Sequence, residues 1–161
     1  MIQLENWFIK FIADYLVVPI VLLGAWAILS SPKNVRWQRV GWAAVAGGVA
    51  LALAWVASLF YQDKRPFLAA GVSAKASYLI NMSFPSLHVL LVFTATFIVW
   101  GATKRPLVSL IMLGLSIVVA IGRMVALVHS PVDVLGGVGC ALLAYLLVYG
   151  HNLMMPKPKE K

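Results

Sequence analysis

The chain has 161 residues, of which 62% are hydrophobic and only 11% are charged. A soluble domain carries about 25% charged residues. A chain of this length cannot bury so much apolar side chain away from water, so the composition excludes an ordinary soluble domain and predicts one domain, residues 1–161, within a lipid bilayer. The formal net charge of +8 does not indicate a nucleic-acid partner, because most basic residues lie in short loops between apolar runs. That pattern is typical of membrane topology and of contact with anionic lipid.

Five apolar segments are long enough, or nearly so, to cross a hydrocarbon core of about 30 Å as helices. The predicted fold class is therefore an all-α, polytopic membrane helix bundle. The segments are Phe11–Ser30, Gly41–Tyr61, Pro85–Gly101, Pro106–Gly122 and Pro131–Leu153. The connection Gln62–Phe84 is too polar to span the membrane. We expect it to lie at the interface, with a short helix near Ala74–Ile80.

Clusters of basic residues follow the first, third and fifth segments, which an odd number of spans places on one side. They are Lys33, Arg36 and Arg39; Lys104 and Arg105; and Lys157, Lys159 and Lys161. Cytoplasmic loops are enriched in Lys and Arg. We therefore expect a multi-pass protein of the cell (inner) membrane, with its N-terminus outside and its C-terminus inside.

Some residues are assigned to packing rather than to chemistry. Ala46, Ala50, Ala54 and Ser58 recur every four residues, which predicts close approach of a neighbouring helix. The single cysteine, Cys140, cannot form an internal disulfide and is interpreted as a small packing residue. His151, near the cytoplasmic end of the last segment, is interpreted as an interfacial residue.

Three short stretches hold most of the remaining polar side chains: Lys64–Phe67, Phe84–His88 and Gly122–Asp133. The end of an even span and the start of an odd span lie on the same membrane face, so the three stretches can meet on the outer side. Ionisable groups near the membrane interior are costly, and function is their default explanation. The candidate residues are Arg65, Ser86, His88, Arg123, His129 and Asp133.

Each candidate also has a structural explanation when it is taken alone. A histidine at the end of a span is more often an interfacial polar group than a catalyst, and the two arginines could be snorkelling anchors. Asp133 could cap the last span, because Ser130-Pro131-Val132-Asp133 resembles a capping box with proline at the first helical position. The gathering of all six candidates on one face favours a functional site.

These residue types together fit phosphoryl transfer through a covalent intermediate. Two guanidiniums neutralise phosphate oxygens, and Ser86 with the N–H groups at the start of its helix adds donors. A neutral imidazole attacks phosphorus while a carboxylate fixes its tautomer, and a second, protonated imidazole supplies the leaving group with a proton. A metal site of two histidines and one aspartate is a weaker interpretation, because two arginines would repel the cation. Neither a metal nor another cofactor is expected.

In these motifs the sequence resembles the type 2 phosphatidic acid phosphatase superfamily of membrane lipid phosphatases. That family's pattern consists of Lys-x6-Arg-Pro, Pro-Ser-x-His and Ser-Arg-x5-His-x3-Asp. The matching positions are Arg65-Pro66; Pro85-Ser86-Leu87-His88; and Arg123, His129 and Asp133 with both spacings intact, followed by Val134-Leu135-Gly136-Gly137.

The resemblance implies a nucleophile at His129, its orienting partner at Asp133 and a general acid at His88. It also implies phosphate binding by Arg65, Ser86 and Arg123, and no metal. The family lysine falls at Ser58 in this chain, and we add Lys64 as a candidate replacement for its charge. Two further departures are Leu87, where a small or acidic residue is usual, and Gly122, where the family has serine.

The favoured substrate is undecaprenyl diphosphate, since short bacterial members that act on it are similar in size and in motif context. Phosphatidylglycerol phosphate, phosphatidic acid, a lipid A phosphate and a decaprenyl phosphoribose phosphate are alternatives. A lipid phosphotransferase and a non-catalytic lipid-binding or assembly protein are the competing hypotheses. The sequence does not predict the oligomeric state.

Overall fold

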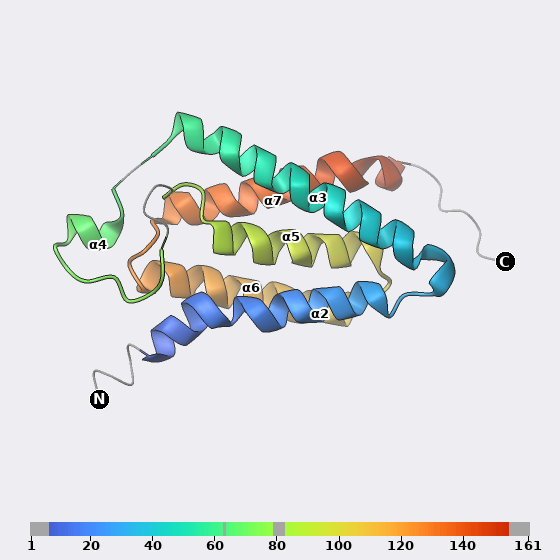
Figure 1. The fold of residues 1–161 in the computed structure, drawn as a ribbon, viewed down its shortest axis with the longest axis horizontal. Coiled ribbons are helices and arrows are strands. Elements are labelled where there is room, and N and C mark those ends of the chain that lie inside the picture. The colour runs from blue at the N-terminus through green and yellow to red at the C-terminus, as the bar shows by residue number, and fades with distance from the viewer. Residues whose placement is uncertain (1–6, 63, 79–82, 155–161) are drawn as a thin grey trace.

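The protein is an elongated bundle of helices (Figure 1). The structure is a computed structural model, and it describes residues 7–62, 64–78 and 83–154. In chain order the elements are the π-helical turn η1 (Phe11–Tyr15) and the helices α2 (Val17–Leu29), α3 (Lys33–Phe60), α4 (Pro66–Ala69), α5 (Leu87–Ala102), α6 (Pro106–Val125) and α7 (Pro131–Met154). Within these described ranges, four helical segments, Trp7–Leu29 being one of them, are long and apolar enough to cross a membrane, and α5 is a shorter apolar helix. The predicted all-α membrane helix bundle is confirmed.

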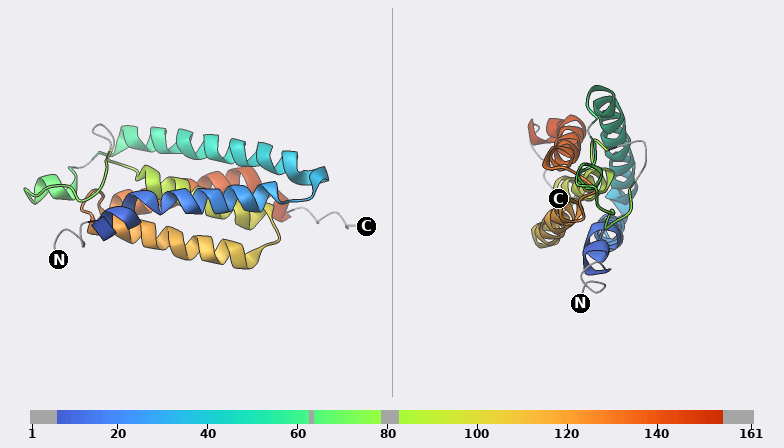
Figure 2. Two further views of the ribbon diagram at one scale, coloured as in Figure 1. Left: turned by 60° about the horizontal axis from the view of Figure 1, so that its bottom comes forward. Right: turned by 90° about the vertical axis from the view of Figure 1, so that its left-hand side faces the viewer.

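Helix α5 lies at the centre of the bundle and packs against α2, α3, α6 and α7 (Figure 2). Its 16 residues extend for about 24 Å, less than the hydrocarbon core of a bilayer. This length is tolerated because four neighbouring helices, rather than lipid, cover much of the helix. Its N-cap residue, Ser86, is fully buried, so the polar start of α5 is enclosed by its neighbours.

The small-residue stripe of α3 is its buried face, as the sequence predicts. The buried residues of this helix are Ala46, Ala50, Ala54 and Ser58, and the helix contacts α5 and α7. Large side chains such as Leu51 and Trp55 lie exposed, where lipid is the natural solvent for apolar surface. Small residues on the inner face let the helix backbones approach closely.

The helix that contains the predicted second span begins at Lys33, eight residues before the apolar segment that starts at Gly41. The apolar run predicts only the part of the helix that lies in hydrocarbon, whereas the basic residues before it continue the same helix beyond that layer. The cluster of Lys33, Arg36 and Arg39 is therefore helical. Arg36 and Arg39 donate hydrogen bonds to Ser31, just after the end of α2.

The prediction of a short helix near Ala74–Ile80 is wrong for the part of this segment that the structure describes. Residues 74–78 are not helical, and residues 79 and 80 lie outside the described ranges. A short helix, α4, forms earlier instead, with Pro66 at its first position, where the fixed φ of proline suits a helix start. The backbone N–H and carbonyl of Ser77 form hydrogen bonds with side chains of the first span and of α6, and not with backbone groups of a helix.

The packing of α3 predicts that Ala50→Leu destabilises the protein, whereas Ala52→Leu does not. Ala50 is 1% exposed and Ala52 is exposed on the same helix. Overpacking a closely packed contact costs about 1–3 kcal/mol, so the melting temperature in detergent should fall for Ala50→Leu alone. Equal melting temperatures for the two variants would contradict the close contact.

Candidate active site

The three polar stretches meet around one cavity of about 330 Å³. The cavity lies at the end of the bundle where α5 and α7 begin and α6 ends (Figure 1). Its walls combine four arginine and histidine side chains with apolar and neutral polar ones. The lining residues are Arg65, His88, Arg123 and His129, together with Val17, Ser77, Tyr78, Leu87 and Leu91.

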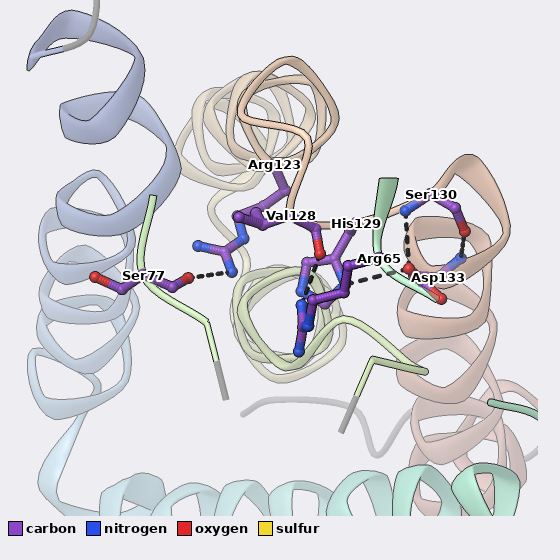
Figure 3. Close-up of polar contacts among 7 residues, drawn as sticks. All are labelled: Arg65, Ser77, Arg123, Val128, His129, Ser130 and Asp133. Atoms are coloured by element: carbon purple, nitrogen blue, oxygen red, sulfur yellow. Dashed lines mark hydrogen bonds and ion pairs between the residues drawn. The ribbon is translucent and has the colours of Figure 1, made fainter. Parts of the chain in front are cut away.

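His129 lies in the turn between α6 and α7, and Asp133 in the first turn of α7 faces it. The Nδ1 atom of His129 is 3.4 Å from Oδ2 of Asp133, and both side chains are at least nine-tenths buried. The same Oδ2 accepts a hydrogen bond of 2.8 Å from the N–H of Ser130. The N–H of Asp133 in turn donates to Oγ of Ser130 at 3.2 Å (Figure 3). The predicted capping box is therefore present, and the carboxylate that caps α7 also faces the imidazole.

The environment of His129 favours its neutral form. Burial is the main cause that lowers the pKa of His129, and the positive charges of Arg123 and Arg65 lower it further. The hydrogen bond and the charge of Asp133 act in the opposite direction, but the pKa remains below the ordinary histidine value. A neutral imidazole has the lone pair that nucleophilic attack requires.

Arg65 joins the loop after α3 to the His129 turn. Its side chain is buried, and Nη1 donates a hydrogen bond of 2.6 Å to the carbonyl of Val128. The guanidinium carbon lies 5.2 Å from the centre of the Tyr78 ring, a distance at which a cation is attracted to the ring face. Pro66, the next residue, begins α4, so the arginine is fixed at the start of a helix.

Arg123, in the last turn of α6, is held by two residues that the sequence interpretation missed. Its side chain is 1% exposed, and Nη1 lies 2.6 Å from Oδ1 of Asp14 in the first span. Nη2 donates a hydrogen bond of 2.8 Å to the carbonyl of Ser77 (Figure 3). A signal for Asp14 was present in the sequence, because an aspartate inside an apolar segment is by itself a functional hypothesis. Nothing local marks Ser77.

Helices α5 and α7 touch at Ser86 through the two glycines that follow Asp133 in the motif. A Cβ atom at Gly137 would lie 2.8 Å from the carbonyl oxygen of Ser86, and one at Gly136 would overlap the Phe84 ring. This close approach lets the N–H of Ser86 donate to the carbonyl of Asp133 at 3.0 Å. That donor is therefore used within the protein. The hydroxyl of Ser86 has no hydrogen-bond partner within the described ranges.

Leu127 gives the α6–α7 turn its direction at the cost of backbone strain. Its φ is +60°, a left-handed conformation that costs a branched residue about 1–2 kcal/mol. Its carbonyl accepts a hydrogen bond of 3.0 Å from the N–H of Phe67 in α4. Backbone strain of this kind is often found at functional sites, and here it lies two residues before His129.

Comparison with known families shows the superfamily to which the chain belongs. The model of the PAP2 superfamily matches residues 37–154. The chain belongs to the PAP2 superfamily. Its members are membrane lipid phosphatases and are typically metal-independent. Searches of curated proteins and of solved structures found no match.

The three departures from the PAP2 pattern each have a defined place in the fold. Ser58 is buried in α3, and its hydroxyl donates to the carbonyl of Trp55 at 2.7 Å, within the same helix. Leu87 is part of the cavity wall. Gly122 packs against the first helix: a Cβ atom there would lie 2.6 Å from Cγ2 of Ile12.

Lys64, the candidate replacement for the family lysine, has an exposed side chain and does not line the cavity. Its part in phosphate binding stays a prediction. Within the described ranges, no group of three His, Cys, Asp or Glu residues is placed to hold a metal ion.

The position of Asp133 predicts how the pH dependence of this PAP2 protein responds to mutation. If neutral His129 is required, this residue sets the acid limb of the profile: kcat/KM falls as the pH drops through the pKa of His129, which lies below the ordinary histidine value. Asp133 raises this pKa, so Asp133→Asn should lower the rate and move the acid limb to a still lower pH. Ser130→Ala is the matched control, because it weakens the cap but keeps the carboxylate, and its acid limb should not move. An acid limb that stays in place in Asp133→Asn would contradict the contact.

Proposed function

We propose that this PAP2 protein hydrolyses a lipid phosphate or diphosphate through a phosphohistidine at His129, with undecaprenyl diphosphate as the favoured substrate and undecaprenyl phosphate as the product. The observation that carries the proposal is a single cavity in which a buried imidazole faces both a carboxylate and two guanidiniums. A phosphate ester is anionic and repels nucleophiles. The charges of Arg65 and Arg123 offset that repulsion where His129 would attack.

In the first step, Nε2 of His129 attacks phosphorus, while its Nδ1–H faces Oδ2 of Asp133 at 3.4 Å. A P–N bond forms and the P–O bond to the lipid, or to the lipid phosphate, breaks. The departing oxygen takes a proton from His88, which lines the same cavity. One imidazole must therefore be neutral while the other is protonated, which is the condition for a bell-shaped pH profile.

In the second step, a water molecule attacks the phosphohistidine and gives a proton to His88. The P–N bond breaks, inorganic phosphate leaves, and both histidines return to their starting protonation states. Metal ions have no part in either step, because the developing charge lies against guanidinium groups.

The cavity supports a lipid substrate whose tail stays outside it. Its volume of about 330 Å³ is at the lower end of the range for small-molecule sites, which suits a headgroup and not a long chain. Val17, Leu87 and Leu91 form the apolar wall beside the charged groups, and Leu91 is 48% exposed. We expect the lipid chain to leave the headgroup along this apolar wall. The size and motif context of short bacterial members favour the undecaprenyl tail.

The proposed mechanism predicts that purified protein with a chelator releases phosphate from undecaprenyl diphosphate faster than from the other lipid phosphates named above. His129→Ala should abolish release, because it removes the nitrogen that attacks phosphorus in the first step, and vanadate should inhibit the wild type. The matched control is His151→Ala, since position 151 lies at the opposite end of α7, and its rate should stay within about twofold of wild type.

A strict requirement for a divalent metal would contradict the mechanism. Transfer of phosphate to an added lipid, with no release in water, would instead favour a phosphotransferase. Unchanged biological activity in His129→Ala would favour a non-catalytic lipid-binding protein.

The proposed location of the site, at the outer or periplasmic face, predicts the labelling of two exposed positions in a Cys140→Ser background. The first substitution is Ser73→Cys, in the loop between α4 and α5, at the end of the bundle that carries the cavity. The second is Asn34→Cys, at the start of α3, at the opposite end. A membrane-impermeant maleimide should label the first in intact cells and the second only after permeabilisation. The reverse result would place the site in the cytoplasm.

A further inference from the structure

We propose that Asp14, in the first membrane span, is a positioning residue that fixes the guanidinium of Arg123 and the Ser77 wall of the cavity for phosphoryl transfer. The inference rests on the proposed function, which assigns Arg123 to the phosphate. It extends that function to a segment of the chain that lies before the matched range of the PAP2 superfamily, residues 37–154.

Three hydrogen bonds connect the first span, the α4–α5 loop and α6 in a closed arrangement. Oδ1 of Asp14 lies 2.6 Å from Nη1 of Arg123, and Oδ2 accepts a hydrogen bond of 2.9 Å from the N–H of Ser77. The carbonyl of Ser77 accepts from Nη2 of Arg123 at 2.8 Å. Each of the three groups is therefore bonded to the other two, so a shift of one must displace the others.

The ion pair between Asp14 and Arg123 within this arrangement is buried. The side chain of Arg123 is 1% exposed and that of Asp14 is 9% exposed, so water screens their attraction little. Nη1 and Nη2 of Arg123 are both held by the protein, whereas Nε is buried without a hydrogen-bond partner in the part of the chain that is described. A buried donor without a partner is unusual and requires an explanation, and a phosphate oxygen in the cavity provides one.

The first span is shaped to present Asp14 to the bundle. Asp14 lies in η1, where the N–H of Leu16 bonds to the carbonyl of Phe11 at 3.1 Å, five residues earlier. A π turn carries one residue more than an α turn, which rotates the preceding residues by about 100° and often occurs at functional sites. Ala13, beside Asp14, is fully buried, whereas Tyr15 is 54% exposed. The carboxylate therefore lies at the boundary of the buried face.

Gly122 is the second feature that brings Asp14 to Arg123. A Cβ atom on Gly122 would lie 2.6 Å from Cγ2 of Ile12 and 3.3 Å from the backbone nitrogen of Ala13. A side chain at this position would push the first span away from α6, directly beside the ion pair. Gly122, where the family pattern has serine, is therefore the position at which the first span approaches α6 closely in this chain.

Positioning should matter most in the transition state, when the three equatorial oxygens of the phosphoryl group spread toward their donors. Misplacing a guanidinium by about 1 Å can cost 100-fold in rate. The negative charge of Asp14 also opposes anions in general, so its removal need not weaken the binding of orthophosphate. The two effects separate when a five-coordinate transition-state mimic, vanadate, is compared with tetrahedral orthophosphate.

The test measures kcat and the inhibition constants of vanadate and orthophosphate for wild type, Asp14→Asn and Asp14→Glu, with His129→Ala as the inactive control. For Asp14→Asn we expect kcat to fall about 10- to 100-fold. The ratio of the vanadate constant to the orthophosphate constant should rise about tenfold. Asp14→Glu, which keeps the charge, should recover part of both losses. A merely structural role would lower the amount of active enzyme and leave the ratio unchanged.

A second set of variants tests the same geometry without altering a charged group. Gly122→Ala should reproduce the change in the inhibitor ratio, and Ile12→Ala in the same chain should reverse part of it by removing Cγ2. Gly114→Ala is the matched control on α6, because a Cβ atom added there would meet nothing within 4 Å, and it should behave as wild type.

If the wild type releases phosphate and His129→Ala does not, the proposed function holds. The results for the Asp14 variants then test the positioning role alone. An unchanged inhibitor ratio in both Asp14→Asn and Gly122→Ala would overturn the positioning role. If the wild type releases no phosphate, or His129→Ala retains activity, the proposed function fails instead.

Discussion

The burial of positive charge at one end of an apolar bundle is the constraint on which the rest of the structure depends. Arg65 and Arg123 are nearly inaccessible, and a buried charge without partners costs several kcal/mol. The protein meets this cost with backbone carbonyls from Val128 and Ser77 and with the carboxylate of Asp14. These partners come from the α6–α7 turn, the α4–α5 loop and the first span. The site is therefore also a junction that holds together segments distant in sequence.

Close helix packing makes this junction possible. Ala50 and Ala54 allow α3 to pack closely on the bundle, Gly137 allows α7 to pack on the start of α5, and Gly122 allows the first span to pack on α6. In lipid, helices gain little from the hydrophobic effect and depend on such contacts. The contacts enclose α5, and with it the end of the cavity that carries His88.

Asp133 combines a helix cap with a contact to the proposed nucleophile. Its carboxylate accepts the N–H of Ser130 as part of the capping box of α7, and the same oxygen faces Nδ1 of His129. A helix cap is a rigid feature of the backbone, so an imidazole oriented by it requires little reorganisation. The capping and the functional interpretations of this residue are compatible, and the structure contains the geometry for both.

The sequence by itself determined the features that depend on local spacing. Apolar length predicts the spans, the four-residue repeat predicts the inner face of α3, and Ser130 and Asp133, three residues apart, predict the capping box. Parity alone predicts that the polar stretches share one end of the bundle. Tertiary structure decided the contacts that no local spacing specifies. Asp14 and Arg123 form an ion pair although they are 109 residues apart in the sequence. Ser77 lies in a non-helical segment, and its backbone bonds to both of them. Such partners are selected by which helix faces meet, and that depends on packing along the whole bundle.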